Sequence, residues 1–240
     1  MRVAFRSDRG RKRINNEDSV CVDVDSGIFI LADGMGGHQA GEVASEIAVR
    51  KVHQLVKEKI SGSHESPNYR KCLLESFAGT NDALRQAALV DKSLHGMGTT
   101  LLVAAVGNGK VNICHVGDSR AYVIRESIRQ LTKDQAAGGF LVEYDSWTCE
   151  DIDPGPWRVL TQAVGTSEHL TPEFLEMSVQ KDDFLLLCSD GLTDMLSDDE
   201  ISSIFAQCGR DVECLADCLV DAANDNGGHD NISVIVVKFE

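Results

Sequence analysis

Short apolar segments constrain the fold of this chain more than any other feature of its sequence. Six segments, each five to eight residues long, have the composition of β-strands. They follow one another in runs and do not alternate strictly with helical patterns, which favours antiparallel sheets over a doubly wound parallel sheet. Gly107, Asn108 and Gly109 are typical of a hairpin turn between two of them. The expected strands are residues 27–32, 101–106, 111–116, 121–125, 184–189 and 232–239.

Helical periodicity occupies other parts of the chain. Apolar residues recur at helical spacing over residues 43–56 and 73–88, and again over residues 201–205 and 212–223. Together with the strands they predict an α+β fold in which helices cover antiparallel sheets. The length of 240 residues and a hydrophobic content of 42% suit one globular domain, residues 1–240.

One long stretch, between Lys133 and Thr161, follows neither period. It contains glycines, prolines and aromatic residues without a regular spacing, so we expect a long surface excursion. Excursions of this length in a globular domain are usually functional.

Charge and hydropathy exclude two classes of protein. A formal net charge of −15 argues against binding to nucleic acid, because such proteins neutralise phosphates with Lys and Arg. No uninterrupted apolar stretch approaches the length of about 18 residues that a membrane span needs. The basic N-terminal segment also lacks the apolar core of a signal peptide. We therefore expect no membrane contact and a cytoplasmic location.

The eight cysteines contain no CxxC pair and are expected to be reduced thiols in that compartment. Cys208, Cys214 and Cys218 form the nearest cluster along the chain. Their helical spacing favours core packing over a zinc site.

Aspartates stand next to four of the apolar segments. Asp33 and Asp190 each follow a strand directly and precede a glycine, Asp118 follows a strand within a Gly-Asp-Ser turn, and Asp230 comes just before the last strand. A single Asp-Gly pair is more often a turn than a ligand, because both residues favour turns for backbone reasons. Four such aspartates at strand ends can all face one rim of a sheet layer.

A gathering of these carboxylates requires a positive charge to offset their repulsion. Two unit charges about 4 Å apart repel by roughly 4 kcal/mol at an effective dielectric constant of 20. Hard oxygen ligands suit Mg²⁺ or Mn²⁺, and one shared carboxylate can bridge two such ions. Ions of this kind activate water for in-line attack on phosphorus, so the pattern predicts hydrolysis of a phosphate ester.

The ordered motifs of the chain resemble those of a known family. They are Arg13–Asp18 (RINNED), Asp33–Gly41 (DGMGGHQAG), Gly98–Thr100 (GTT), Gly117–Arg120 (GDSR), Ser189–Asp194 (SDGLTD) and Asp230–Asn231. Their order and spacing resemble the metal-dependent protein phosphatases, the type 2C serine/threonine phosphatases, and the DGMGGH form is similar to the compact bacterial members. The resemblance implies an αββα sandwich of two antiparallel sheets between helical layers, with the metal ions at one end.

The resemblance also implies roles for the carboxylates. Asp33 would bridge two ions, Asp190 and Asp230 would bind the first, and Glu17 with the Gly34 carbonyl would hold the second. Asp18 would orient bound water rather than bind an ion, with Asn231 beside it. For Glu17 the alternative is an exposed loop carboxylate.

Further assignments concern a weaker third ion and the groups around the phosphate. Asp118 and Asp194 match positions that hold a third ion with Asp190 in bacterial relatives, although Asp118 could instead pair locally with Arg120.

Arg13 has the spacing of the family's phosphate-binding arginine, and a guanidinium fork suits two phosphate oxygens. His38 could protonate the leaving alkoxide. Other family members carry a histidine directly after the Asp-Gly pair, where this chain has Met35.

The region of residues 134–160 corresponds to the family's flap and departs from its pattern. Gln135 stands where bacterial relatives commonly have a histidine, and acidic and aromatic residues follow. One hypothesis is that this flap selects basic or aromatic residues around the phosphosite.

These observations predict a Mn²⁺- or Mg²⁺-dependent, monomeric phosphatase that acts on phosphoserine and phosphothreonine in proteins and opposes a serine/threonine kinase. The alternatives are a catalytically silent, phosphoprotein-binding pseudophosphatase and a hydrolase of a small phosphate ester. The sequence contains no Gly-rich loop or dinucleotide fingerprint that would support a nucleotide pocket.

Overall fold

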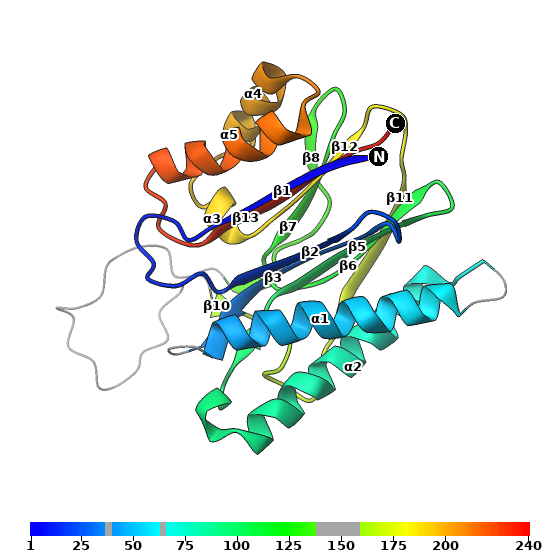
Figure 1. Ribbon diagram of the computed structural model, residues 1–240, viewed down its shortest axis with the longest axis vertical. Coiled ribbons are helices and arrows are strands. Elements are labelled where there is room, and N and C mark those ends of the chain that lie inside the picture. The colour runs from blue at the N-terminus through cyan, green and yellow to red at the C-terminus, as the bar shows by residue number, and fades with distance from the viewer. Residues whose placement is uncertain (37–39, 63–65, 138–158) are drawn as a thin grey trace.

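The fold consists of two antiparallel sheets that pack face to face between two layers of helices (Figure 1). The computed structural model describes residues 1–36, 40–62, 66–137 and 159–240. All strand pairings among these residues are antiparallel. The predicted four-layer αββα sandwich is therefore confirmed.

The first sheet contains both ends of the chain. Its strand order is β1-β13-β12-β7-β8. The strands are β1 (Arg2–Asp8), β13 (Ile232–Lys238), β12 (Phe184–Cys188), β7 (Arg120–Ile124) and β8 (Ile128–Gln130).

The second sheet has the order β11-β6-β5-β3-β2, with the short strand β4 paired to β3. Its hairpin turn contains Asn108 and Gly109 at positive φ, as a tight turn between two strands requires. The strands are β11 (Glu173–Ser178), β6 (Lys110–Val116), β5 (Leu101–Gly107), β3 (Ile28–Met35), β2 (Asp18–Asp23) and β4 (Gly98–Thr99). A separate two-stranded ribbon pairs β9 (Ala136–Ala137) with β10 (Val159–Leu160).

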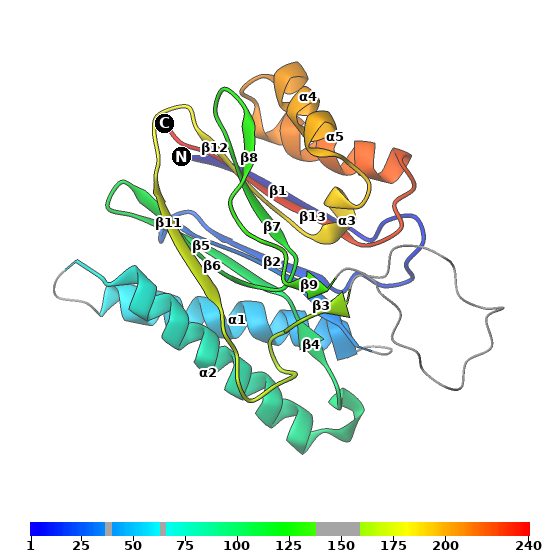
Figure 2. The same ribbon diagram turned by 180° about the vertical axis from the view of Figure 1, so that it is seen from behind.

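The helical layers cover the outer faces of the sheets, as Figure 2 shows from the opposite side. One layer contains α1 (Ala40–Ser61) and α2 (Tyr69–Val90), followed by the short 3₁₀ helix η1 (Lys92–Leu94). The other contains α3 (Asp190–Thr193), α4 (Asp198–Cys208) and α5 (Val212–Asp225). The four predicted helices correspond to α1, α2, α4 and α5, and none of the described helices is long and apolar enough to cross a membrane.

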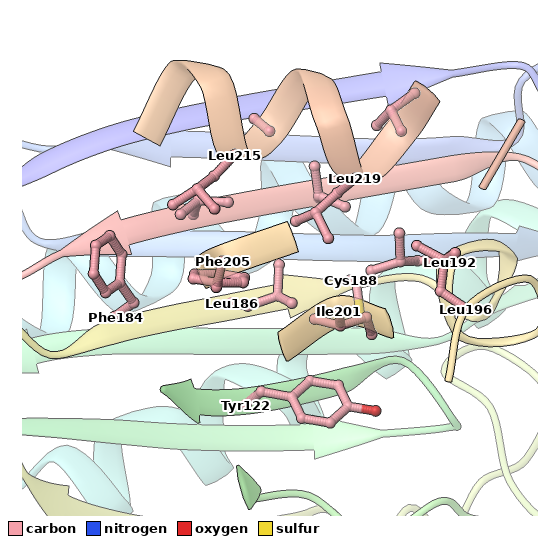
Figure 3. Packing of buried hydrophobic residues seen from close by; sticks show 14 of the residues in the cluster. Tyr122, Phe184, Leu186, Cys188, Leu192, Leu196, Ile201, Phe205, Leu215 and Leu219 are labelled. Atoms are coloured by element: carbon pink, nitrogen blue, oxygen red, sulfur yellow. The ribbon is translucent and has the colours of Figure 1, made fainter. Parts of the chain in front are cut away.

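Central strands are mostly apolar because both of their faces are buried. In β12, Leu185 and Leu187 face the other sheet, whereas Leu186 and Cys188 face α4 and α5. Figure 3 shows this outer cluster, with Leu215 and Leu219 of α5 above the strands. A strand buried on both faces has a nearly continuous apolar sequence, which explains why all six predicted strands are found.

Strands that the sequence pattern missed lie mostly at sheet edges. β1 and β11 border their sheets, and β2 borders the second sheet beside β3. Their sequences mix charged and apolar residues because one face or edge is exposed to solvent. The predicted surface excursion falls mainly on residues 138–158, which lie outside the described part of the chain.

Candidate metal centre

Carboxylates from the second sheet meet near the end of β3. Asp33 lies two residues before the end of this strand, and the first residue of β2, Asp18, is its direct partner across the ladder. Asp118 lies in the turn between β6 and β7, which carries the chain from one sheet to the other. Three acidic groups thus come from neighbouring parts of the sandwich.

The first sheet supplies two more carboxylates. Asp190 follows β12 and is the first residue of α3, and Asp230 lies two residues before β13. Because β12 and β13 are antiparallel, the end of one strand and the start of the next meet at the same edge of the sheet. The sequence prediction that these aspartates share one rim is confirmed by this geometry.

Burial and mutual repulsion strongly raise the pKa values of Asp33 and Asp190. Burial raises the pKa of Asp33 well above its usual value, and the charges of Asp18 and Asp190 raise it further. Burial likewise raises the pKa of Asp190 to about 8, with Asp118 and then Asp230 adding to the shift. Each carboxylate therefore makes its neighbours harder to ionise in the absence of a compensating cation.

Two oxygen atoms of the cluster are buried without a hydrogen-bond partner among the described residues. They are Oδ1 of Asp18 and Oδ1 of Asp190. A buried acceptor without a donor is costly, and it is costlier when ionised. Carboxylate and carbonyl oxygens are the donors that Mg²⁺ and Mn²⁺ prefer, so these residues fit such ions on chemistry and on charge.

Threonine and serine residues hold the aspartates in place. The backbone N–H of Asp33 donates to Oγ1 of Thr100 at 2.9 Å, and Thr100 N–H donates to the Asp33 carbonyl at 2.8 Å. The hydroxyl of Ser189 donates to Oδ2 of Asp18 at 2.8 Å and accepts from the backbone N–H of Ser233 at 2.9 Å. Thr100 and Ser189 occur in the GTT and SDGLTD motifs, but the sequence alone gave them no role.

Three backbone segments, at Glu17, Gly34 and Gly41, meet where the resemblance places the second ion. Gly34 N–H donates to the Glu17 carbonyl at 3.1 Å, and a Cβ atom on Gly34 would lie 2.1 Å from the carbonyl oxygen of Gly41. Only glycine allows this approach. Burial, partly opposed by the charge of Arg13, raises the pKa of Glu17, so this residue is not a freely exposed loop carboxylate.

Asn231 fixes the loop that carries Glu17. Its side-chain oxygen accepts from Glu17 N–H at 2.8 Å, and its amide nitrogen donates to the carbonyls of Arg9 and Asn15 at 2.9 Å. A residue predicted to stand beside the metal ligands therefore joins the N-terminal loop to the start of β13.

Arg13 reaches the same site from this loop. Its Nη2 lies 2.5 Å from Oδ2 of Asp230, and the side chain lines the cleft. An arginine has five N–H donors, so this contact leaves others available for a phosphate group.

Of the remaining predicted residues, Asp118 and Asp194 lie in the cleft, whereas His38 is not among the described residues. Asp118 and Asp194 both line the cleft, and both charges raise the pKa of Asp190. The guanidinium of Arg120 donates to the Asp134 carboxylate and to the Tyr122 hydroxyl.

Gln135 joins the base of the predicted flap to the GDSR turn. Its side-chain oxygen accepts from Gly117 N–H, and its own N–H donates to the Gly117 carbonyl, both at 3.0 Å. The acidic and aromatic residues on which the flap hypothesis depends lie outside the described part of the chain.

The cleft above the carboxylates has a volume of about 1320 Å³. Carboxylates and Arg13 line it together with the apolar side chains of Met35, Val159, Leu160 and Met195. This combination can bind cations together with an anionic group on a larger molecule.

Comparison with known proteins gives consistent matches over nearly the whole chain. A family model described as protein phosphatase 2C matches residues 8–221. The serine/threonine phosphatase stp of Listeria monocytogenes is 37% identical over 243 aligned residues, which cover 99% of this chain and 96% of that protein. Protein phosphatase PhpP of Streptococcus pneumoniae is 37% identical over 248 aligned residues, which cover 100% and 98%.

Solved structures give the same result. The serine/threonine phosphatase PstP/Ppp of Mycobacterium tuberculosis has a TM-score of 0.83 at 33% identity and covers 100% of this chain and 98% of that one. The catalytic domain of PstP in complex with two manganese ions has a TM-score of 0.80 at 31% identity, with coverage of 99% and 97%.

Proposed function

The chain belongs to the protein phosphatase 2C family and is a metal-dependent protein-serine/threonine phosphatase, and we propose that the carboxylates gathered at the sheet ends hold its ions. Asp33 would bridge two ions, Asp190 and Asp230 would complete the first position, and Glu17 with the Gly34 carbonyl would complete the second. The observation that carries this assignment is the buried Oδ1 of Asp190, which has no hydrogen-bond partner in the described part of the chain and lies among carboxylates that raise its pKa.

The ions, Mn²⁺ or Mg²⁺, supply water activation and charge neutralisation when bound. The chain supplies the positions. Two hydrogen bonds hold carboxylates in position: Thr100 Oγ1 accepts from the backbone N–H of Asp33, and the Ser189 hydroxyl donates to Asp18. Asp18 and Asn231 orient the groups around the ions rather than bind them.

Arg13 binds the phosphate group of the substrate through guanidinium N–H donors that its contact with Asp230 leaves available. Hydrolysis breaks the phosphorus–oxygen bond to the serine or threonine, and the departing oxygen must take up a proton. We assign this proton donor to His38, which follows the glycine pair after Asp33 in the sequence.

A third, weaker ion would be held by Asp118 and Asp194 together with Asp190. Support comes from the position of both residues in the cleft and from their effect on the pKa of Asp190.

The substrates are phosphorylated proteins. We further propose that the enzyme opposes a cognate serine/threonine kinase as a cytoplasmic monomer. Residues 1–240 would form one catalytic domain with a flap at about 134–160.

Counting bound Mn²⁺ by equilibrium dialysis tests the assignments with three charge-removing variants. Wild-type protein should bind two ions tightly and a third weakly. Asp33→Asn should lose both tight ions, Glu17→Gln one of them, and Asp118→Asn only the weak one. Two tight ions retained by Asp33→Asn would contradict the bridging role.

A further inference from the structure

Three cysteines meet at the junction of α4 and α5. Cys208 is the last residue of α4, and Cys214 and Cys218 lie four residues apart on the first two turns of α5. Only residues 209–211 connect the helices, and Gly209 has a φ of 65°, a left-handed conformation that allows a sharp reversal. This reversal brings the end of α4 back onto the face of α5 that carries both cysteines.

The sulfur atoms are arranged like ligands of a single ion. The Sγ atoms of Cys214 and Cys218 are 3.9 Å apart, and all three Sγ atoms lie within 4.8 Å of one another. Thiolates bound to Zn²⁺ at about 2.3 Å with tetrahedral angles stand about 3.8 Å apart. Across the described residues, this is the one group of three His, Cys, Asp or Glu ligand atoms that approach one another this closely.

Core packing accounts for only part of this arrangement. Cys208 packs against the apolar cluster beneath α4, but all three cysteines are only partly buried. Packing at partly buried positions does not require the three sulfur atoms to lie close to one another. Partial exposure also gives an ion a path to the sulfurs.

The electrostatic surroundings favour a cation. Cys208 lies at the C-terminal end of α4, where the unpaired carbonyls carry partial negative charge. Burial and hydrogen bonds with the other two thiols raise the pKa of Cys208. Cysteine binds a metal as the thiolate, so binding an ion here would release a proton from Cys208.

The cysteine cluster is separate from the carboxylates. α5 runs from the α4 junction back toward α3 and the end of the sandwich where Asp190 lies (Figure 1). From Cys214 to the end of α5 at Asp225 the helix rises about 16 Å, at roughly 1.5 Å per residue. A metal at the cysteines therefore does not share ligands with the catalytic centre.

We propose that Cys208, Cys214 and Cys218 form a binding site for one thiophilic ion of the Zn²⁺ type, with solvent in the fourth position. The ion joins the last turn of α4 to the first turns of α5. The helical spacing that favoured simple packing was visible in the sequence, but the sharp turn at Gly209 that adds the third sulfur was not.

Titration of the full-length protein with Co²⁺ tests this site, because thiolate ligands give Co²⁺ a charge-transfer absorption that carboxylate ligands do not. The protein is first saturated with Mg²⁺ so that the carboxylates are occupied. Wild-type protein should bind one equivalent of Co²⁺ with this absorption, and Zn²⁺ should displace it. Cys208→Ser, Cys214→Ser and Cys218→Ser should each weaken binding at least about tenfold.

Cys21→Ser is the matched control, since Cys21 is also partly buried but lies on β2. It should leave the Co²⁺ absorption unchanged, and Mn²⁺-dependent phosphate release by all four variants should report an intact fold. The proposal is overturned if wild-type protein gives no thiolate absorption, or if the triple serine variant retains it. It is also overturned if two of these thiols are lost to a disulfide in metal-free protein.

Discussion

Replacing one ionisable side chain of the carboxylate cluster with a neutral one should stabilise the metal-free protein. Asp190→Asn keeps the shape of the side chain and removes its ionisation, at a buried position where Oδ1 has no hydrogen-bond partner among the described residues. In the folded wild type the pKa of Asp190 is raised to about 8 from a usual value of 3.8. The folded state therefore holds a proton that the unfolded chain releases, and stability falls as pH rises between these two values.

The size of this effect follows from linkage. Each pH unit in that window costs about 1.4 kcal/mol for one such group. Between pH 5.5 and 7.5 the metal-free wild type should lose up to about 3 kcal/mol that Asp190→Asn does not lose. For a chain of this length, about 3 kcal/mol corresponds to a difference of roughly 6–12 °C in Tm.

Thermal unfolding followed by circular dichroism in EDTA measures this difference at pH 5.5, 6.5 and 7.5. Asp190→Asn should have the higher Tm, by a margin that widens with pH. Saturating Mn²⁺ should reverse the order, because only the wild type binds its ions fully. Asp82→Asn, at an exposed position on α2, is the control. Equal Tm values for wild type and Asp190→Asn at every pH in EDTA would refute the reasoning.

Three further substitutions test how the site is built. Gly34→Ala places a Cβ atom 2.1 Å from the Gly41 carbonyl oxygen, so chemical denaturation should show a loss of several kcal/mol, on the order of 3, or no folded protein; wild-type stability would contradict this close approach. Ser189→Ala removes the donor to buried Asp18 and should lower the free energy of unfolding by about 1–3 kcal/mol, measured in urea. An unchanged midpoint would show that the bond contributes nothing. Arg13→Ala should lower kcat/KM for a phosphothreonine peptide about 10- to 100-fold while Arg13→Lys recovers part of the loss; equal rates for Arg13→Ala and wild type would exclude phosphate binding by this side chain.

The central part of the fold was predictable because its strands are buried on both faces. β5 and β12 are continuous apolar runs and β6 and β13 are mostly apolar, and such runs are visible in a single sequence. β1 and β11 were missed because edge strands carry charged residues that blur the pattern.

Sequence reasoning located the candidate site but not its internal bonds. Aspartates next to apolar strands pointed to one edge of the sheets, because the end of a strand and the start of its antiparallel neighbour lie at the same edge. The bond from Ser189 to Asp18 joins the two sheets across 171 positions of sequence, and its partners depend on how the sheets pack. The contact of Arg13 with Asp230 likewise joins residues that are far apart in the sequence.

The most direct test of the account measures phosphate release from phosphoserine and phosphothreonine peptides by wild-type protein and Asp33→Asn. With saturating Mn²⁺ the wild type should turn over, and EDTA should abolish its activity. Asp33→Asn should lose at least about 100-fold in kcat even at high Mn²⁺, because it removes the carboxylate proposed to bridge both ions. Wild-type turnover by Asp33→Asn, or full activity in EDTA, would contradict the assignment of this carboxylate cluster as the catalytic metal centre.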